Sequence, residues 1–165
     1  MEAWFAILSN AFWCGCAALG FSVLFNTPRV ALLSVWVCGF MAGLIKFGVI
    51  NPEIGGGMLG ASWLAASAVG FASIPFSHRC HVPPTIISIP AVIPLVPGSF
   101  AYRTMLDLIK FISDADHSVL TGTIHNGLMT LFILIALSVG VTLPMLLFRI
   151  QSVKNVRLKF PWSEE

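Results

Sequence analysis

The sequence contains very few charged residues. Lys, Arg, Asp and Glu together make up 10% of its 165 residues, against about 25% in soluble globular domains. Hydrophobic residues make up 57%, so a soluble core of this size would lack polar side chains to cover it. No segment is polar enough to form a separate soluble domain. We therefore expect an all-α integral membrane protein, with one transmembrane domain over residues 1–150 and a short basic cytoplasmic tail over residues 151–165.

The sequence also lacks the motifs of catalysis and of nucleic-acid binding. It has no nucleophile elbow, no phosphate-binding glycine loop and no metalloprotease helix motif. The spacing of His78, Cys80 and His81 matches no standard zinc site. The formal net charge is only +2 and most basic residues are scattered. We expect no enzyme activity, no cofactor, no metal and no nucleic-acid partner, so that any energy the protein uses must come from a gradient or a partner.

Long apolar runs divide the chain into membrane spans. Four runs exceed or approach the roughly 20 residues that a helix needs to cross the hydrocarbon core. The last run is longer than a crossing requires, so it must tilt, protrude or break, and His125–Gly127 and Pro144 are the expected points of a break. These runs cover residues 3–25, 30–50, 55–76 and 118–148.

Between the third and the last run lies a segment rich in proline. Proline removes an amide donor and disturbs helical hydrogen bonding, so this segment predicts a broken fifth crossing over residues 85–112. The break is expected near residues 83–98, which hold prolines at 83, 84, 90, 94 and 97. Broken backbone survives at membrane depth only inside protein or beside a water-filled cavity, as in many transporter sites. The segment therefore indicates a transport path.

The distribution of Lys and Arg predicts the orientation. With five crossings and an external N-terminus, six basic residues lie on the cytoplasmic side and three on the outer side. We therefore expect a multi-pass protein of the cell inner membrane with a cytoplasmic C-terminus. If the broken segment is re-entrant, the number of crossings changes by one.

The strongest candidate for a substrate site is Pro97-Gly98 followed by a helix from about Ser99. Unpaired amides at such a helix start, and the positive end of its dipole, suit a carboxylate. An ordinary proline kink is the alternative. Arg103 can add a bidentate contact to an anionic or zwitterionic substrate, or can belong to a structural charge ladder with Asp107. Tyr102 can gate or bond the substrate, or can anchor the helix at the membrane surface.

Three further polar residues lie in or near apolar segments. Lys46 is charged within the second span, which indicates either a substrate contact or a side chain that snorkels to the membrane surface. His125 lies in the last span and Asp107 precedes it. Both are candidates for proton coupling, although a lone histidine in a helix is more often simply hydrogen-bonded.

Three motifs carry a resemblance to a known family. The sequence Phe25-Asn26-Thr27-Pro28 ends the first span, Pro94-Leu95-Val96-Pro97-Gly98 forms the break, and Ser138 to Pro144 is a glycine-containing end of the last span. Together they resemble the threonine/serine exporter family. The resemblance is specifically to the small subunit of its split, two-component members, which include the bacterial succinate exporter. It covers nearly the whole chain.

The resemblance implies a secondary exporter that works by alternating access and is driven by the proton gradient. The implied substrate is threonine and serine, or a dicarboxylate such as succinate. The implied partner is a larger membrane subunit that corresponds to the N-terminal half of single-chain relatives, and a homo-oligomer is also possible. Asn26 joins the substrate-binding candidates through its motif. Relatives often carry His-Arg in the second span where this chain has Ile45-Lys46. The alternative is a structural subunit that stabilises its partner without contacting substrate.

Overall fold

A computed structural model describes residues 2–51, 55–114 and 117–148. These residues form helices and no strand. Four helices are long and apolar enough to span a membrane, and a bent pair brings the number to five if it counts as one span. The prediction of an all-α membrane protein with about five spans is therefore confirmed. The tail expected over residues 151–165 lies outside the described residues. In chain order the elements are α1 (Glu2–Leu24), α2 (Arg29–Ile50), α3 (Met58–Cys80), α4 (Pro84–Val92), a 3-10 turn η1 (Ile93–Leu95), α5 (Gly98–Asp114) and α6 (His117–Leu147).

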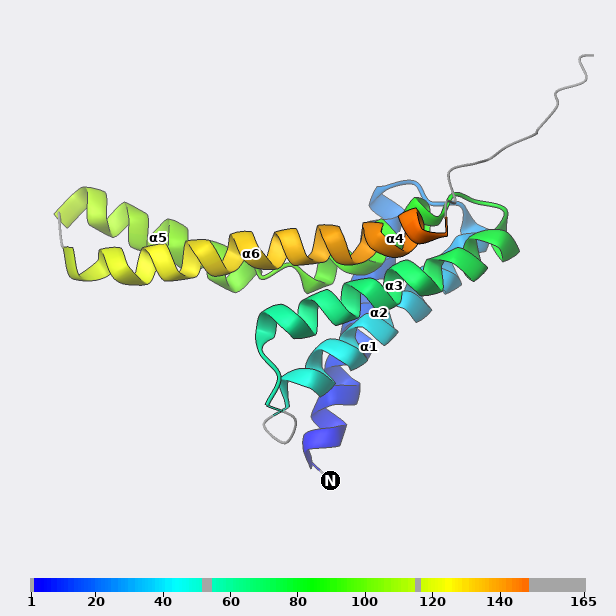
Figure 1. Cartoon of the computed structure of the whole chain (residues 1–165), viewed down its shortest axis with the longest axis horizontal. Helices are drawn as coiled ribbons and strands as arrows, with labels where there is room; N and C mark the ends of the chain where they lie inside the picture. The colour runs from blue at the N-terminus through cyan, green and yellow to red at the C-terminus, as the bar shows by residue number, and fades with distance from the viewer. Residues whose placement is uncertain (1, 52–54, 115–116, 149–165) are drawn as a thin grey trace, which may run out of the picture.

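Helices α1, α2 and α3 form a bundle (Figure 1). Small residues let these helices approach one another closely. A Cβ atom added to Gly43 of α2 would lie 2.7 Å from the Cα of Ala11 on α1, and one added to Gly39 would lie 2.6 Å from the Cβ of Ala18. Neither position admits a larger side chain without moving a helix. Close backbone approach of this kind stabilises helix pairs in lipid, where burial of apolar surface gives no driving force between helices.

The proline-rich segment packs into this bundle instead of standing beside it. Helix α4 contacts α1, α2 and α3, and η1 contacts α1 and α2. Ile87, Ala91 and Leu95 of this segment are fully buried. The segment thus lies inside protein, which is where backbone broken by prolines is tolerated at membrane depth.

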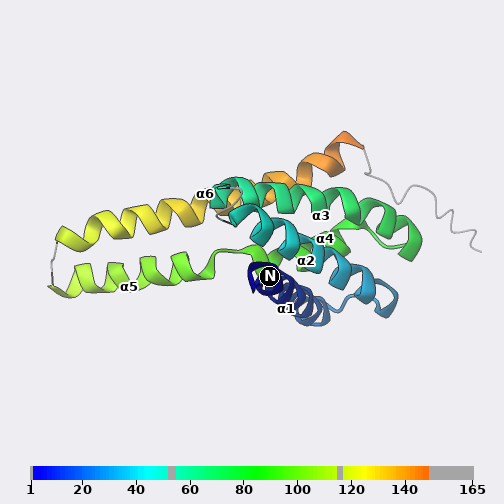
Figure 2. The ribbon, with the colours of Figure 1, turned by 90° about the horizontal axis from the view of Figure 1, so that it is seen from below.

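Helices α5 and α6 run side by side and extend away from the bundle as a two-helix arm (Figures 1 and 2). Only the second half of α6 reaches back to the bundle, where it packs along α3. There a Cβ on Gly140 would lie 2.8 Å from the Cβ of Ala66 and 2.9 Å from the carbonyl oxygen of Trp63. We define the arm as α5 together with residues 117–134 of α6.

Two details differ from the expectation. Helix α3 begins at Met58 and continues to Cys80, through polar residues beyond the third expected span, which covers residues 55–76. Helix α6 is continuous from His117 to Leu147, so of the three alternatives for this long run the break at His125–Gly127 or Pro144 does not occur. Pro144 is fully buried and packs against Gly70 of α3. This packing stabilises a proline that would otherwise weaken the helix.

Candidate functional site

The break in the proline-rich segment falls between Leu95 and Gly98. The chain is helical through Val92, continues as a 3-10 turn to Leu95, and is extended at Val96, with φ −59° and ψ 131°. Val96 precedes Pro97, and a residue before proline is pushed out of the helical region. Helix α5 then starts at Gly98, so that the segments before and after the break meet at an angle of 54°. The predicted break is therefore present, and it is confined to two residues.

Lys46 occupies this break from the side of α2. Its Nζ donates a hydrogen bond of 2.7 Å to the carbonyl oxygen of Leu95, and the residue is only 6% exposed. In an uninterrupted helix this carbonyl would accept the amide of residue 99, so the break leaves it without its ordinary partner. The lysine side chain fills that role across 49 residues of sequence. A charged residue in the second span is thus buried and directed at the break, and does not snorkel to the surface.

The burial of this ammonium group is incompletely compensated. An ammonium carries three N–H donors, and among the described residues the Leu95 carbonyl is its one hydrogen-bond acceptor. No carboxylate of the described part of the chain forms an ion pair with it. A buried charge without a counter-ion costs several kcal/mol, so this position is suited to an anionic group supplied from outside the described chain.

The start of α5 offers fewer free amides than the sequence predicts. The Gly98 amide donates to the carbonyl of Val96 at 2.9 Å, and the amides of Phe100 and Ala101 donate to the carbonyl of Pro97 at 3.2 Å. Ser99 is exposed beside them. Most of the hydrogen-bonding capacity at this helix start is therefore used within the turn, and anion binding there stays a prediction.

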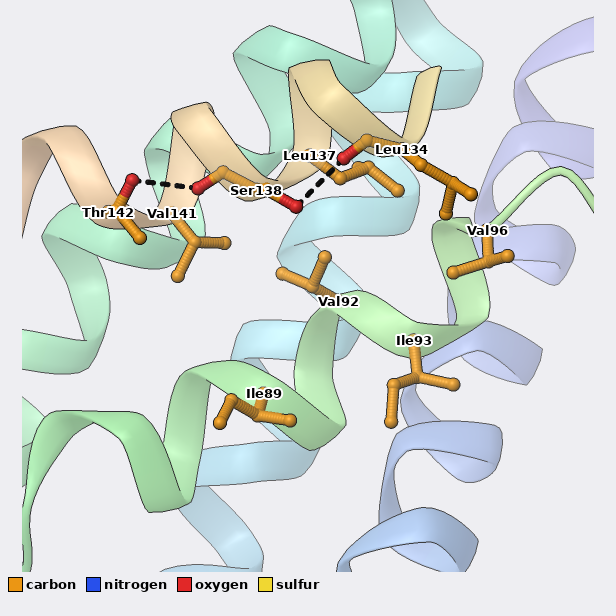
Figure 3. A pocket seen from close by; sticks show the side chains of 9 residues that line it. All are labelled: Ile89, Val92, Ile93, Val96, Leu134, Leu137, Ser138, Val141 and Thr142. Carbon is orange, nitrogen blue, oxygen red and sulfur yellow. Dashed lines mark hydrogen bonds between the residues drawn. The ribbon is translucent and has the colours of Figure 1, made fainter. Parts of the chain in front are cut away.

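A cavity of about 310 Å³ lies between the broken segment and α6 (Figure 3). Nearly all of its wall is apolar, and the polar groups are the hydroxyls of Ser138 and Thr142. These hydroxyls donate to the carbonyls of Leu134 and Ser138, at 2.9 and 2.8 Å. Their oxygens keep lone pairs for a guest. The residues that line the cavity are Ile89, Val92, Ile93, Val96, Leu134, Leu137, Ser138, Val141 and Thr142.

Sequence reasoning missed Ser138 and Thr142 as candidates. The available signal was their spacing of four residues in an otherwise apolar helix, which places both hydroxyls on one face. The same spacing is common in membrane helices, where such hydroxyls bond to their own backbone, as they do here.

Asn26 lies in a second cavity, of about 270 Å³, where the turn between α1 and α2 meets the start of α4. Asn26 adopts a positive φ of 54°, which lets the chain reverse direction before Pro28. Thr27 and Thr85 also line this cavity. It lies at the first residues of α2 and α4, whereas Lys46 and Leu95 lie toward their other ends. The structure therefore does not bring Asn26 and Lys46 into one site.

The remaining predicted residues lie on the arm. Tyr102 is 65% exposed and Arg103 is exposed. Asp107 is half-buried, and the described residues provide no ion pair to it, so the expected charge ladder does not form ion pairs. His125 is exposed on α6. The break residues thus meet Lys46, while the residues assigned to proton coupling lie apart from it.

A family model described as "Threonine/Serine exporter, ThrE" matches residues 10–147, which is most of the chain. The chain belongs to the threonine/serine exporter family. This is a family of transporters and not a family of enzymes. The resemblance of the three motifs to this family is therefore confirmed at the level of the family, and all three lie within the matched residues.

One curated relative is an uncharacterized protein of Haemophilus influenzae. It is 28% identical over 146 residues, which cover 86% of this chain and 48% of the relative. The chain thus spans about half the length of this relative. No solved structure matches the chain.

Proposed function

We propose that this chain is a membrane subunit of a two-component secondary exporter of a small polar metabolite. The substrate class is threonine and serine, or a dicarboxylate such as succinate, and the proton gradient is the driving force. Membership of the exporter family supports transport, and the half-length match supports a larger second subunit. We also propose that the N-terminus lies outside the cell and that the C-terminus lies in the cytoplasm.

The observation that carries this proposal is the buried contact between Lys46 and the broken segment. Charged residues within membrane spans are costly and usually face a substrate or ion path, and broken helices commonly form transporter sites. Both features meet at the Leu95 carbonyl. Because the ammonium retains unused N–H donors, a substrate carboxylate can bind it when the segment moves.

The proposed cycle is a movement of α4, η1 and the start of α5 relative to α2. In the described state the Lys46–Leu95 hydrogen bond holds the break against the bundle. A carboxylate that binds the ammonium competes with the Leu95 carbonyl and releases this hold, which couples substrate binding to the movement. His125 and Asp107 stay candidates for the proton step, and Pro97, Gly98, Ser99, Tyr102 and Arg103 for contacts along the path.

Export of labelled threonine and labelled succinate from loaded cells tests the proposal. The chain is expressed alone, with the larger family subunit, and with that subunit as Lys46→Met, Arg103→Ala or Arg79→Met. Arg79 is an exposed cation at the end of α3 and serves as control. We expect export only with both subunits, and a loss of at least about ten-fold in Lys46→Met at equal protein level. Unchanged export in Lys46→Met would exclude the lysine from the path.

A structural subunit is the second candidate, because Tyr102 and Arg103 lie on an exposed helix face and in neither of the two cavities described above. It predicts that export needs this chain but tolerates both Lys46→Met and Arg103→Ala. Absence of export in every combination would overturn the exporter assignment for these substrates.

A further inference from the structure

The arm has two chemically different sides, although both of its helices belong to segments apolar enough for a membrane. Helix α5 packs against α6, and its half-buried residues at every third or fourth position mark the side that faces α6: Phe100, Thr104, Asp107 and Phe111. In α6 the residues that face α5 include Thr123, Gly127 and Thr130, and a Cβ on Gly127 would lie 3.4 Å from the Thr104 methyl group. This contact seam divides the arm into two faces.

Large apolar side chains occupy the positions directly after the contact residues in both helices. On α5 these are Met105 and Ile112, with Ile109 beside them, and on α6 they are Ile124, Leu128 and Leu131. Each of them is about half exposed or more, from 49% for Leu128 to 74% for Ile112. The two helices are antiparallel and face each other along the seam. In this arrangement, residues that come one position after a contact residue lie on the same side of the arm in both helices. We call this the apolar side.

The positions directly before the contact residues lie on the opposite side, and they hold polar side chains as well as the apolar Leu106 and Met129. The polar side chains are Arg103 and Lys110 on α5, both exposed, and Asn126 on α6. Arg103 and Lys110 are seven residues apart, or about 10.5 Å along the helix. In the described part of the chain neither cation forms an ion pair. We call this the polar side.

These two sides require different surroundings in a bilayer. The apolar side can face lipid, because it carries no charge. The polar side cannot, because exposed cations in the hydrocarbon region are expensive unless protein or water covers them. The bundle does not cover it, since α5 packs against α6 and projects away from the other helices (Figures 1 and 2). Something outside the described chain has to cover the polar side.

We propose that the polar side of the arm is the surface on which the second membrane subunit docks, and that this subunit presents acidic side chains to Arg103 and Lys110. The inference rests on the proposed function in assuming a second subunit. Charge complementarity favours it over a second copy of this chain, because two such copies would bring their exposed cations together. The match to only 48% of the relative leaves a further half to serve as the occupant.

Tryptophan substitution on opposite sides of α5 tests the docking surface. The full chain is co-expressed with the larger family subunit, solubilised in mild detergent and recovered through a tag. Arg103→Trp adds bulk to the polar side and removes a cation, whereas Met105→Trp adds bulk to the apolar side two residues later. Lys110→Glu reverses a charge without adding bulk. All three positions are exposed and project from the arm, so folding is checked simply by membrane level and thermal melting.

We expect Arg103→Trp and Lys110→Glu to lower recovery of the larger subunit at least about ten-fold, as for a buried charge pair. Met105→Trp should recover it within about two-fold of the unaltered chain, as bulk facing lipid adds no clash. Loss only in Met105→Trp would overturn the proposal in favour of docking through the apolar side. Full recovery with all three variants would overturn the arm as an interface.

Two further outcomes separate this inference from the proposed function. If the unaltered chain recovers the larger subunit and supports export, but the polar-side variants change neither, the two-component function stands and the docking surface is wrong. If the unaltered chain recovers only copies of itself, and Arg103→Trp disperses them, the occupant is a second copy. Absence of any association of the unaltered chain overturns both the two-component function and the docking surface.

Discussion

The bundle and the arm of this molecule are held together in different ways. In the bundle, and where the second half of α6 joins it, helix backbones meet at glycines where even a methyl group would clash, as at Gly43 against Ala11 and Gly140 against Ala66. In the arm, the pairing of α5 with α6 leaves ordinary space at Gly127. The bundle encloses the proline-rich segment on several sides. The arm instead leaves side chains exposed along both of its helices.

The largest effect that tests this contrast is expected from Gly140→Ala. The new methyl group would lie within 3 Å of the Ala66 Cβ and of the Trp63 carbonyl, at 2.8 and 2.9 Å, and backbone cannot yield as a flexible side chain does. We expect the free energy of unfolding in detergent to fall by about 3 kcal/mol, the upper part of the usual range for overpacking. Thermal melting of the purified chain measures it.

Gly122→Ala is the control for Gly140→Ala. Gly122 lies in the same helix, and nothing lies within 4 Å of an added Cβ. Its melting temperature should not fall. Equal losses in both variants would show that α6 needs flexibility throughout and that close packing is not what distinguishes the bundle.

An intermediate effect is expected at Lys46, which links the bundle to the broken segment. Lys46→Met removes a hydrogen bond and leaves the Leu95 carbonyl without this partner, which costs about 1 to 3 kcal/mol. It also removes a buried ammonium that has no counter-ion, and losing this unfavourable burial stabilises the fold by a similar or larger free energy. We expect the unfolding free energy to change by less than about 1 kcal/mol while export is lost.

Lys46→Ala is the matched comparison, because it also removes the packed aliphatic stem. Its unfolding free energy should fall by about 2 kcal/mol, as for other cavities left by truncation. If Lys46→Met is destabilised as much as Lys46→Ala, the hydrogen bond to Leu95 is a structural pin and not part of a moving site.

Much of this fold was predictable from composition and proline placement. The apolar runs predict α1, α2 and α6 closely, because about 20 apolar residues leave little choice but a membrane helix. The break at Val96 and Pro97 follows from the restrictions that proline places on itself and on the preceding residue. Local chemistry was less reliable where packing decides. Pro144 and the polar residues at the end of α3 remain helical, and Pro144 is held there by its contact with Gly70.

The candidate site was predictable in its residues but not in its arrangement. Lys46 and the Pro97-Gly98 break stand out in the sequence because a charge and a helix break are both costly in a membrane. Their meeting through the Leu95 carbonyl depends on how α4 and η1 pack against α2. Lys46 and Leu95 are 49 residues apart, and no spacing in the sequence reveals their contact. The same limit explains why Asn26 was grouped with these residues although it lies in a separate cavity.

The smallest effect, and the opposite sign to Gly140→Ala, is expected from Gly127→Ala in the arm. The added methyl group would lie 3.4 Å from the Thr104 methyl group, which is ordinary contact. Alanine also favours a helix over glycine by about 0.5 to 1 kcal/mol. The gain should appear as slower hydrogen exchange of the α6 amides around residue 127, with the amides near residue 140 unchanged. Faster exchange would show that the glycine is needed for α5 and α6 to pair, so that the arm, like the bundle, depends on close backbone approach.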